Sequence, residues 1–184
     1  FALGADIYRM IVRTYDGKVF KSKDPYFGDT MFPAVNVILP TPNAKTKLTE
    51  DKESEKINGY SGGYTNLFKT GIAYDTRDFE PNPRKGIFAE INFIKSSRAW
   101  GSDFNFQREL VHAKIFYLVL PRIFSELIFA GRVALTRITG TIPFYEYRHI
   151  WSIDTPIYGL GGGTVLKGYR QDRFVGNVMG FGNF

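Results

Sequence analysis

The sequence has no cysteine, and only 2 histidines and 3 methionines occur among its 184 residues. The lack of cysteine excludes disulfide scaffolds, thiolate metal sites and cysteine nucleophiles. His112 and His149 are too far apart in the chain for the i, i+4 spacing of a helical zinc site. We therefore predict no metal site and no cofactor, with His112 lining the interior of the fold and His149 in a loop.

Long apolar runs are also absent. The longest strongly apolar stretch, 115–120, is too short for a membrane-spanning helix. The mean hydropathy of -0.19 suits a soluble protein, but a membrane β-barrel is apolar only at alternate positions and also scores near neutral. The formal net charge is +6, yet basic and acidic residues are interleaved along the chain, so nucleic acid is not a predicted partner.

Aromatic residues (16%) and 19 glycines favour an all-β fold. Apolar and polar residues alternate with period two in six segments, each near the ~9–11 residues that a tilted strand needs to cross a bilayer. These segments are 2–15, 64–79, 87–95, 104–120, 126–138 and the region from 175 onward.

Each segment has one apolar and one charged face. In the fourth, Val111, Ile115 and Tyr117 alternate with Arg108 and His112. Two interpretations are open: a soluble antiparallel sheet with its apolar face on a core, or a membrane barrel with a water-filled interior.

Connection lengths favour the barrel. The predicted turns 80–86 and 121–125 are short, whereas the other three connections are longer, and 16–63 and 139–174 are very long. Alternation of short turns and long external loops is typical of outer-membrane barrels. The Lys/Glu-rich stretch 44–58 indicates a solvated loop. Aromatic residues near strand ends suit an interfacial girdle, namely Tyr64, Trp100, Phe104 and Phe124.

One motif matches a catalytic pattern. Residues 59–63 read Gly-Tyr-Ser-Gly-Gly, as in a hydrolase nucleophile elbow, but a charged loop precedes this serine and a strand, not a helix, follows it. We predict no catalytic residue.

Two further motifs are more specific. The first is a glycine-rich segment formed by Gly161, Gly162, Gly163, Leu166, Lys167, Gly168, Tyr169, Arg170, Asp172 and Arg173. It lacks the Gly-Lys-Ser/Thr of a phosphate-binding loop, so its glycines indicate a sharply turning backbone. The second is a strand-and-turn fingerprint formed by Asp75, Arg77, Asp78, Asn82, Pro83 and Gly86. Asp75 and Arg77 share a face, which favours a charge network within the sheet over acid–base chemistry.

Together these motifs resemble the signatures of the bacterial surface antigen superfamily, the barrels of BamA- and TamA-type outer-membrane insertases and their translocase relatives. The resemblance covers 64–184. It implies an all-β fold in which 1–184 is part of a transmembrane antiparallel β-barrel, with about six strands of a barrel of about sixteen, because six strands cannot close a barrel in lipid. It also implies a long external loop at 16–63 and a lid loop at 139–174.

In this family the basic residue of the glycine-rich motif pairs with acids on the inner barrel wall and locks the lid. Most members have arginine there, whereas this chain has Lys167, with Arg170 three residues later. Lysine cannot form the bidentate carboxylate pair of arginine, so the resemblance implies a weaker lock or one shared with Arg170. The receiving acids are expected beyond Phe184.

The resemblance further implies a non-enzymatic role in protein insertion, assembly or translocation at the bacterial outer membrane. The expected partners are outer-membrane lipid and lipopolysaccharide, unfolded client barrel or secreted proteins, and lipoproteins. One alternative is a membrane anchor or export barrel for a patatin-like or other hydrolase domain. Another is a soluble, ligand-binding β-domain.

Overall fold

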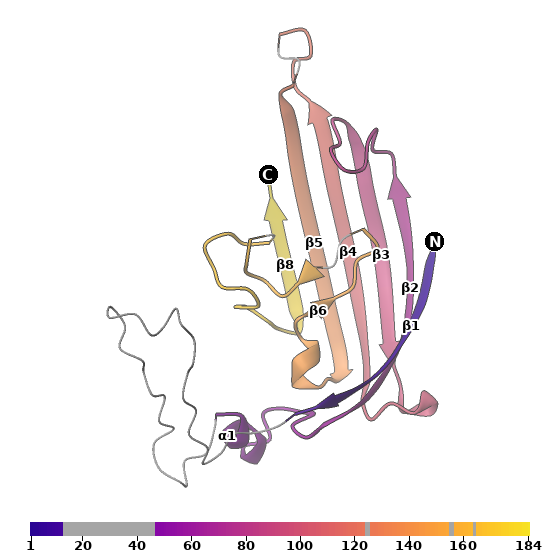
Figure 1. Ribbon diagram of the computed structural model, residues 1–184, viewed down its shortest axis with the longest axis vertical. Helices are drawn as coiled ribbons and strands as arrows, with labels where there is room; N and C mark the ends of the chain where they lie inside the picture. Colours follow the sequence, from indigo (N-terminus) through magenta and orange to yellow (C-terminus); the bar gives the residue numbers. More distant parts are fainter. Residues whose placement is uncertain (13–46, 124–125, 155–156, 164) are drawn as a thin grey trace, which may run out of the picture.

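The computed structural model describes residues 1–12, 47–123, 126–154, 157–163 and 165–184. Six strands form one antiparallel sheet in the order β1-β2-β3-β4-β5-β8 (Figure 1). Their bounds are β1 Ala2–Ile11, β2 Gly62–Asp75, β3 Gly86–Ser96, β4 Asn105–Leu118, β5 Ile128–Thr141 and β8 Val178–Asn183. All six predicted strands are therefore present, and the all-β prediction is confirmed. Residues 13–15 of the first predicted strand lie outside the described ranges.

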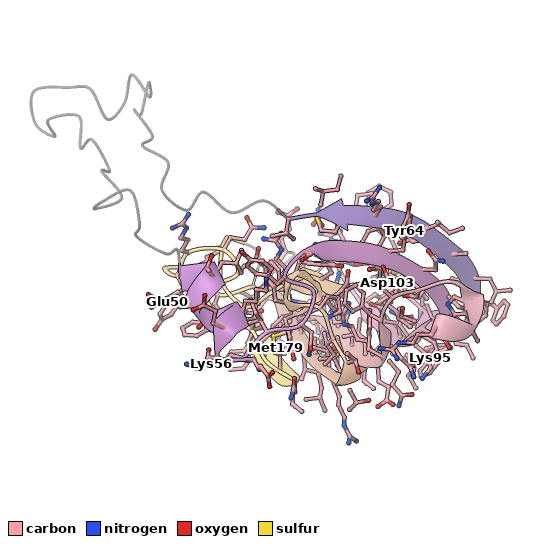
Figure 2. The ribbon with its side chains drawn as sticks, turned by 90° about the horizontal axis from the view of Figure 1, so that it is seen from below. Glu50, Lys56, Tyr64, Lys95, Asp103 and Met179 are labelled. Carbon is pink, nitrogen blue, oxygen red and sulfur yellow. The ribbon has the colours of Figure 1, made fainter. Side chains whose placement is uncertain are left out.

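Each large strand pairs with the next one in this order, so the sheet is a curved wall with β1 and β8 at its two edges (Figure 2). Because the sheet is open, it has the geometry of part of a barrel. The short elements are α1 Lys47–Glu53, the 3-10 turns η1 Arg98–Trp100 and η2 Phe144–Glu146, and the paired strands β6 His149–Ile150 and β7 Ile157–Tyr158.

No helix in the described part of the chain is long and apolar enough to cross a membrane.

The outer face of the sheet is apolar and exposed. One row of directly paired residues crosses four strands, from Ile72 through Ile91 and Val111 to Leu135. Their exposed fractions lie between 52% and 65%, far above those of core residues. A contiguous apolar surface of this kind is unusual in soluble proteins and is typical of the lipid-facing side of a barrel.

The inner face carries the polar side chains. Glu90, Asn92, Arg108 and His112 are all buried on it, although they belong to strands whose alternate residues are apolar. The predicted division of the strands into an apolar and a charged face is thus confirmed. The soluble-sheet alternative requires the outer face to be polar, whereas its central row is apolar and exposed.

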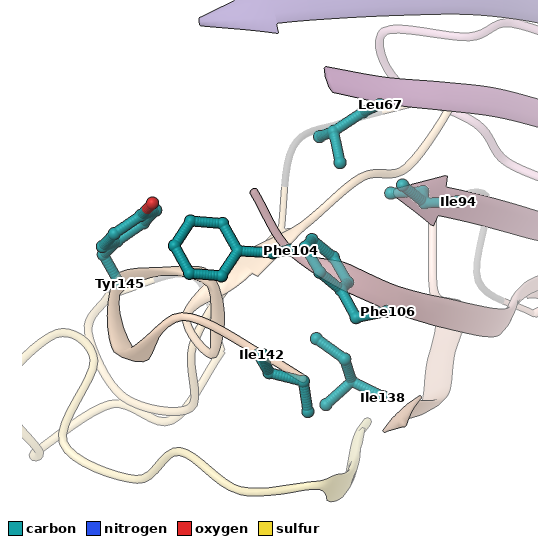
Figure 3. Packing of buried hydrophobic residues seen from close by; sticks show 7 residues of the cluster. All are labelled: Leu67, Ile94, Phe104, Phe106, Ile138, Ile142 and Tyr145. Atoms are coloured by element: carbon teal, nitrogen blue, oxygen red, sulfur yellow. The ribbon is translucent and has the colours of Figure 1, made fainter. Parts of the chain in front are cut away.

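The segment between β5 and β8 covers part of the inner face, and two apolar clusters form beneath it. Figure 3 shows the first cluster, whose buried members are Leu67, Ile94, Phe104, Phe106, Ile138, Ile142 and Tyr145. The second contains Leu110, Ala134, Ile150, Val165 and Met179.

The girdle prediction is wrong for Phe104, which is only 6% exposed and packs edge-on against Tyr145. The physical reason is that the residues just before β4 bend under the lid, where an aromatic ring finds apolar neighbours. Tyr64 and Trp100 are exposed as expected, at 49% and 45%. Phe124 lies outside the described residues.

The predicted alternation of short and long connections holds only in part. The β3–β4 connection, 97–104, is eight residues long, shorter than the ten-residue connection 76–85 between β2 and β3. It stays short because η1 is capped by the Ser97 side chain and ends at Gly101, whose φ of 82° permits a tight exit. The connections that follow β1 and β5 are long, as predicted.

The predicted external loop also differs from expectation. Residues 16–46 lie outside the described ranges, and the remainder contains α1, which was not predicted. Lys and Glu favour helix when no packing opposes it, and Lys52 lies over the Tyr60 ring at 4.3 Å.

The exposed apolar outer face leads to a testable prediction about stability in lipid. Ile91 lies at the centre of β3 and is 65% exposed. We expect Ile91→Lys to destabilise the protein in lipid vesicles by about 2–4 kcal/mol, because a cation near the bilayer midplane is poorly solvated. Thr141→Lys, at the exposed end of β5, is the matched control and should change stability by less than about 1 kcal/mol. Equal stabilities in a denaturant titration of the folded protein in vesicles would contradict a lipid-facing outer surface.

Candidate functional site

The candidate site is the lid segment, defined by the structure as residues 142–177, together with the inner face that it covers. The predicted lid began at 139, but 139–141 continue β5, and 175–177 precede β8. Three groups of polar contacts join the lid segment to the inner face. Each has one buried carboxylate at its centre.

Glu90 of β3 is the centre of the first group and is 2% exposed. Its Oε1 lies 2.8 Å from Nδ1 of His112 and also accepts a hydrogen bond from the Ser152 hydroxyl. Its Oε2 accepts one from the Asn92 side-chain amide at 2.8 Å and one from the Ile153 backbone N–H at 2.7 Å. A buried carboxylate is tolerated only when its acceptor sites are filled, and the lid segment supplies two of these donors.

Asp154 of the lid segment is the centre of the second group. Its carboxylate forms one ion pair with Arg77, at 3.0 Å, and a second with Lys114 of β4. The side chain of Asp154 is 7% exposed and that of Arg77 is 5% exposed. These ion pairs are therefore shielded from water and stronger than surface pairs.

Glu146 in η2 is the centre of the third group. It accepts a hydrogen bond from the Tyr8 hydroxyl of β1, lies 3.5 Å from Arg108 of β4 and lies 3.6 Å from His149. Burial alone raises the pKa of Glu146, but the neighbouring His149 ring, the charge of Arg108 and the hydrogen bond from Tyr8 outweigh it and hold the pKa below its ordinary value.

The glycine-rich motif forms the far part of the lid segment. Val165 is 3% exposed in the second apolar cluster, and its carbonyl accepts a hydrogen bond from the Asn183 side chain of β8 at 2.9 Å. Gly161 and Gly162 have φ values of 127° and 80°, where a side chain would be strained. The Gly162 N–H donates to the Tyr169 carbonyl at 2.9 Å, which closes the loop on itself.

Several residues of this motif are exposed. Lys167, Gly168, Tyr169, Arg170 and Arg173 are exposed, as is Gly163, whereas Leu166 and Asp172 are half-buried. Gly168 has a φ of 91°, so the predicted bend is present there. Tyr169 packs edge-on against Phe174. Within the described residues Lys167 forms no ion pair, and its expected lock to acids beyond Phe184 stays a prediction.

The strand-and-turn fingerprint follows the end of β2. Asp75 and Arg77 form the predicted charge pair through two hydrogen bonds of 2.9 and 2.6 Å. The Asp78 carboxylate accepts the backbone N–H groups of Arg84, Phe79 and Lys85, which hold its pKa below the ordinary value.

The end of this turn, at Gly86, depends on a positive φ angle. Gly86 has a φ of 117°, and a Cβ there would collide with the Thr76 carbonyl. Asn82 is exposed and Pro83 half-buried in the same turn.

The comparison with known families decides the relationship. A family model described as the Omp85 superfamily domain matches residues 12–180. The chain belongs to the Omp85 superfamily. This confirms the resemblance carried by the two motifs. A search of curated proteins and a search of solved structures returned no match.

Membership fixes the general role of the domain. Omp85 domains are β-rich outer-membrane proteins of bacteria or organelles that insert or translocate proteins, and the superfamily is generally non-enzymatic. The lid segment of this Omp85 domain covers part of the polar inner face, so its contacts control access to that face.

The period-two alternation of 87–95 places Glu90 on the charged face but gives it no partner, and the sequence did not identify Glu146, Ser152 or Asp154 as contact residues. The only sequence signal was an acid at an inward position of an otherwise apolar strand. Within the described ranges no cluster of His, Cys, Asp or Glu is suited to a metal ion.

The third group predicts a pH dependence. Because the pKa of Glu146 is lowered on folding from 4.5, its stabilising contribution is complete above about pH 4.5 and is lost as the pH falls through the folded value. We expect hydrogen exchange in residues 144–150 to accelerate below pH 4.5, after correction for the intrinsic rate. In Glu146→Gln the exchange should already be fast at neutral pH and should no longer change with acidification. A wild-type profile retained in this variant would show that another group titrates.

Proposed function

We propose that this Omp85 domain acts as a BamA/TamA-like barrel that assists the folding and insertion, or the translocation, of other proteins at the bacterial outer membrane. The observation that supports it best is the inverted sheet. An exposed apolar outer face suits lipid, and the polar inner face is covered by a lid segment that contacts β1 to β5 and β8.

The activity proposed is non-enzymatic. Ser152, Glu90 and His112 lie together and resemble a hydrolytic triad in composition. However, the Ser152 hydroxyl and His112 Nδ1 both contact Glu90 Oε1, so the carboxylate, and not the imidazole, is the acceptor for the serine hydroxyl. A serine nucleophile requires a base within hydrogen-bonding reach of its hydroxyl, and a carboxylate held by four donors is a poor base. The geometry therefore suits a lid anchor.

The proposed partners follow from the two faces. Outer-membrane lipid and lipopolysaccharide would contact the apolar outer face, and unfolded client barrel or secreted proteins would be handled by the barrel, with lipoproteins as further partners. In such a mechanism the client pairs its own strands with an open sheet edge, since main-chain hydrogen bonding to an edge needs no specific client sequence. The glycine-rich motif would steady the barrel during this step.

The proposal is tested with the protein that carries this domain, reconstituted in liposomes. We expect it to accelerate insertion of an unfolded client barrel, measured as acquisition of heat-modifiable mobility and protease resistance. Gly168→Val should lower that rate several-fold, because a β-branched residue is strained by ~1–3 kcal/mol at the left-handed φ found there. Lys167→Ala should also lower the insertion rate, because the resemblance assigns the lid lock to this residue.

Two outcomes would each contradict one part of this proposal, the first the insertion activity and the second the role of the glycine-rich motif. A correctly folded barrel that gives no acceleration would exclude insertion of that client and favour translocation or an anchoring role. Normal activity of Gly168→Val would show that the bend at Gly168 is not needed, with Gly176→Val as a comparison at a lid glycine outside the motif.

A further inference from the structure

We infer that the lid segment of this domain is anchored by its stem, residues 151–154, and that Arg77 of the strand-and-turn fingerprint is the positioning residue of that anchor. The importance of lid position rests on the proposed function, whereas the anchor itself is argued from contacts alone. The expected lock lay instead at the tip, at Lys167, whose side chain is exposed.

Four consecutive stem residues each contact the inner face. The Trp151 carbonyl accepts a hydrogen bond from Asn92 at 3.2 Å, and Ser152 and Ile153 both donate to Glu90. Asp154 binds Arg77 and Lys114. The contacts reach β3, β4 and Arg77 in the turn after β2, so the stem is fixed to two neighbouring strands and to that turn.

Arg77 is held in place before it meets the lid. Asp75 binds its guanidinium through two hydrogen bonds, and the guanidinium lies 4.8 Å from the centre of the Phe88 ring. An arginine supported on one side by a carboxylate and below by a ring has little freedom left to lose when a second carboxylate binds. Its Nη2 also lies 3.0 Å from Asp154 and, at the exposed side of the turn, 3.7 Å from Glu80.

The turn between β2 and β3 also fixes the position of Arg77. Thr76 Oγ1 and the Ile87 backbone exchange hydrogen bonds of 3.0 and 3.1 Å, and Asp78 fixes the turn through three backbone N–H groups. Arg77 lies between these two fixed residues, so its backbone is fixed on both sides.

Gly71 of β2 provides independent support. It is buried on the inner face, and a Cβ there would collide with the Asn92 side-chain oxygen and lie 3.0 Å from Cδ1 of Ile153. A side chain at Gly71 would therefore displace the Asn92 amide, which donates to the Trp151 carbonyl of the stem, and crowd the Ile153 side chain.

The anchor is tested by measuring how often the lid lifts. The chain has no cysteine, so Val165→Cys introduces a single thiol, at a lid position that is 3% exposed and separate from the stem. The maleimide labelling rate of this thiol is measured in reconstituted protein without any client. Asp154→Asn and Arg77→Gln are each added to this background, and Arg84→Gln is the matched control because Arg84 pairs with Glu126 between two turns.

We expect Asp154→Asn and Arg77→Gln each to raise the labelling rate at least about tenfold, since each removes the buried Arg77–Asp154 ion pair that joins the stem to the sheet side. Arg84→Gln should stay within about twofold, as exposed pairs contribute little. Asp154→Glu, which keeps the charge, should restore a slow rate in part, and Arg77→Lys should not, because lysine lacks the fork that binds two carboxylates.

An unchanged rate in a heat-modifiable, folded Asp154→Asn protein would overturn the stem anchor. If that variant does not fold, Arg77→Gln decides in the same way. Because no client is present, fast labelling would support the anchor even if the protein inserted no client, so the two proposals fail independently.

Discussion

A strand that faces hydrocarbon on one side must place its polar side chains on the other, and the rest of this structure depends on that constraint. The outer row from Ile72 to Leu135 meets it with apolar groups. The inner face then carries Glu90, Arg108 and His112, which a covering segment deprives of water. The lid segment can lie there only because it brings donors and acceptors that match them, so covering the sheet and satisfying its charges are one requirement.

The charges are arranged with cations on the sheet and acids on the lid. Arg77 and Lys114 face Asp154, and Arg108 faces Glu146. The sheet acid Glu90 meets only neutral lid groups, so no acid of the lid opposes it. Buried pairs of this kind add little net stability, because desolvation offsets attraction, but a lid displaced by one residue would leave charges unpaired. They therefore fix where the lid lies, since losing one partner is costly even where the intact pair adds little.

The two motifs of the chain perform different physical tasks. In the glycine-rich motif the backbone is the active part, since positive φ at Gly161, Gly162 and Gly168 turns the chain back on itself. In the strand-and-turn fingerprint the side chains are active, because Asp78 fixes the turn while Arg77 reaches the lid. The two tasks meet in the lid segment, whose stem contacts Arg77 and whose later part holds the glycines.

The sequence by itself determined the strands, their two faces and the superfamily, because period-two alternation and turn residues act over a few neighbours. It could not show that Phe104 turns inward, or that Asp154 rather than Lys167 pairs with the sheet within the described residues. Those contacts join residues far apart in the chain, and their choice depends on strand register and on the path of the lid. Only the tertiary structure decides them, since a carboxylate in the sequence carries no information about which distant cation will be desolvated beside it.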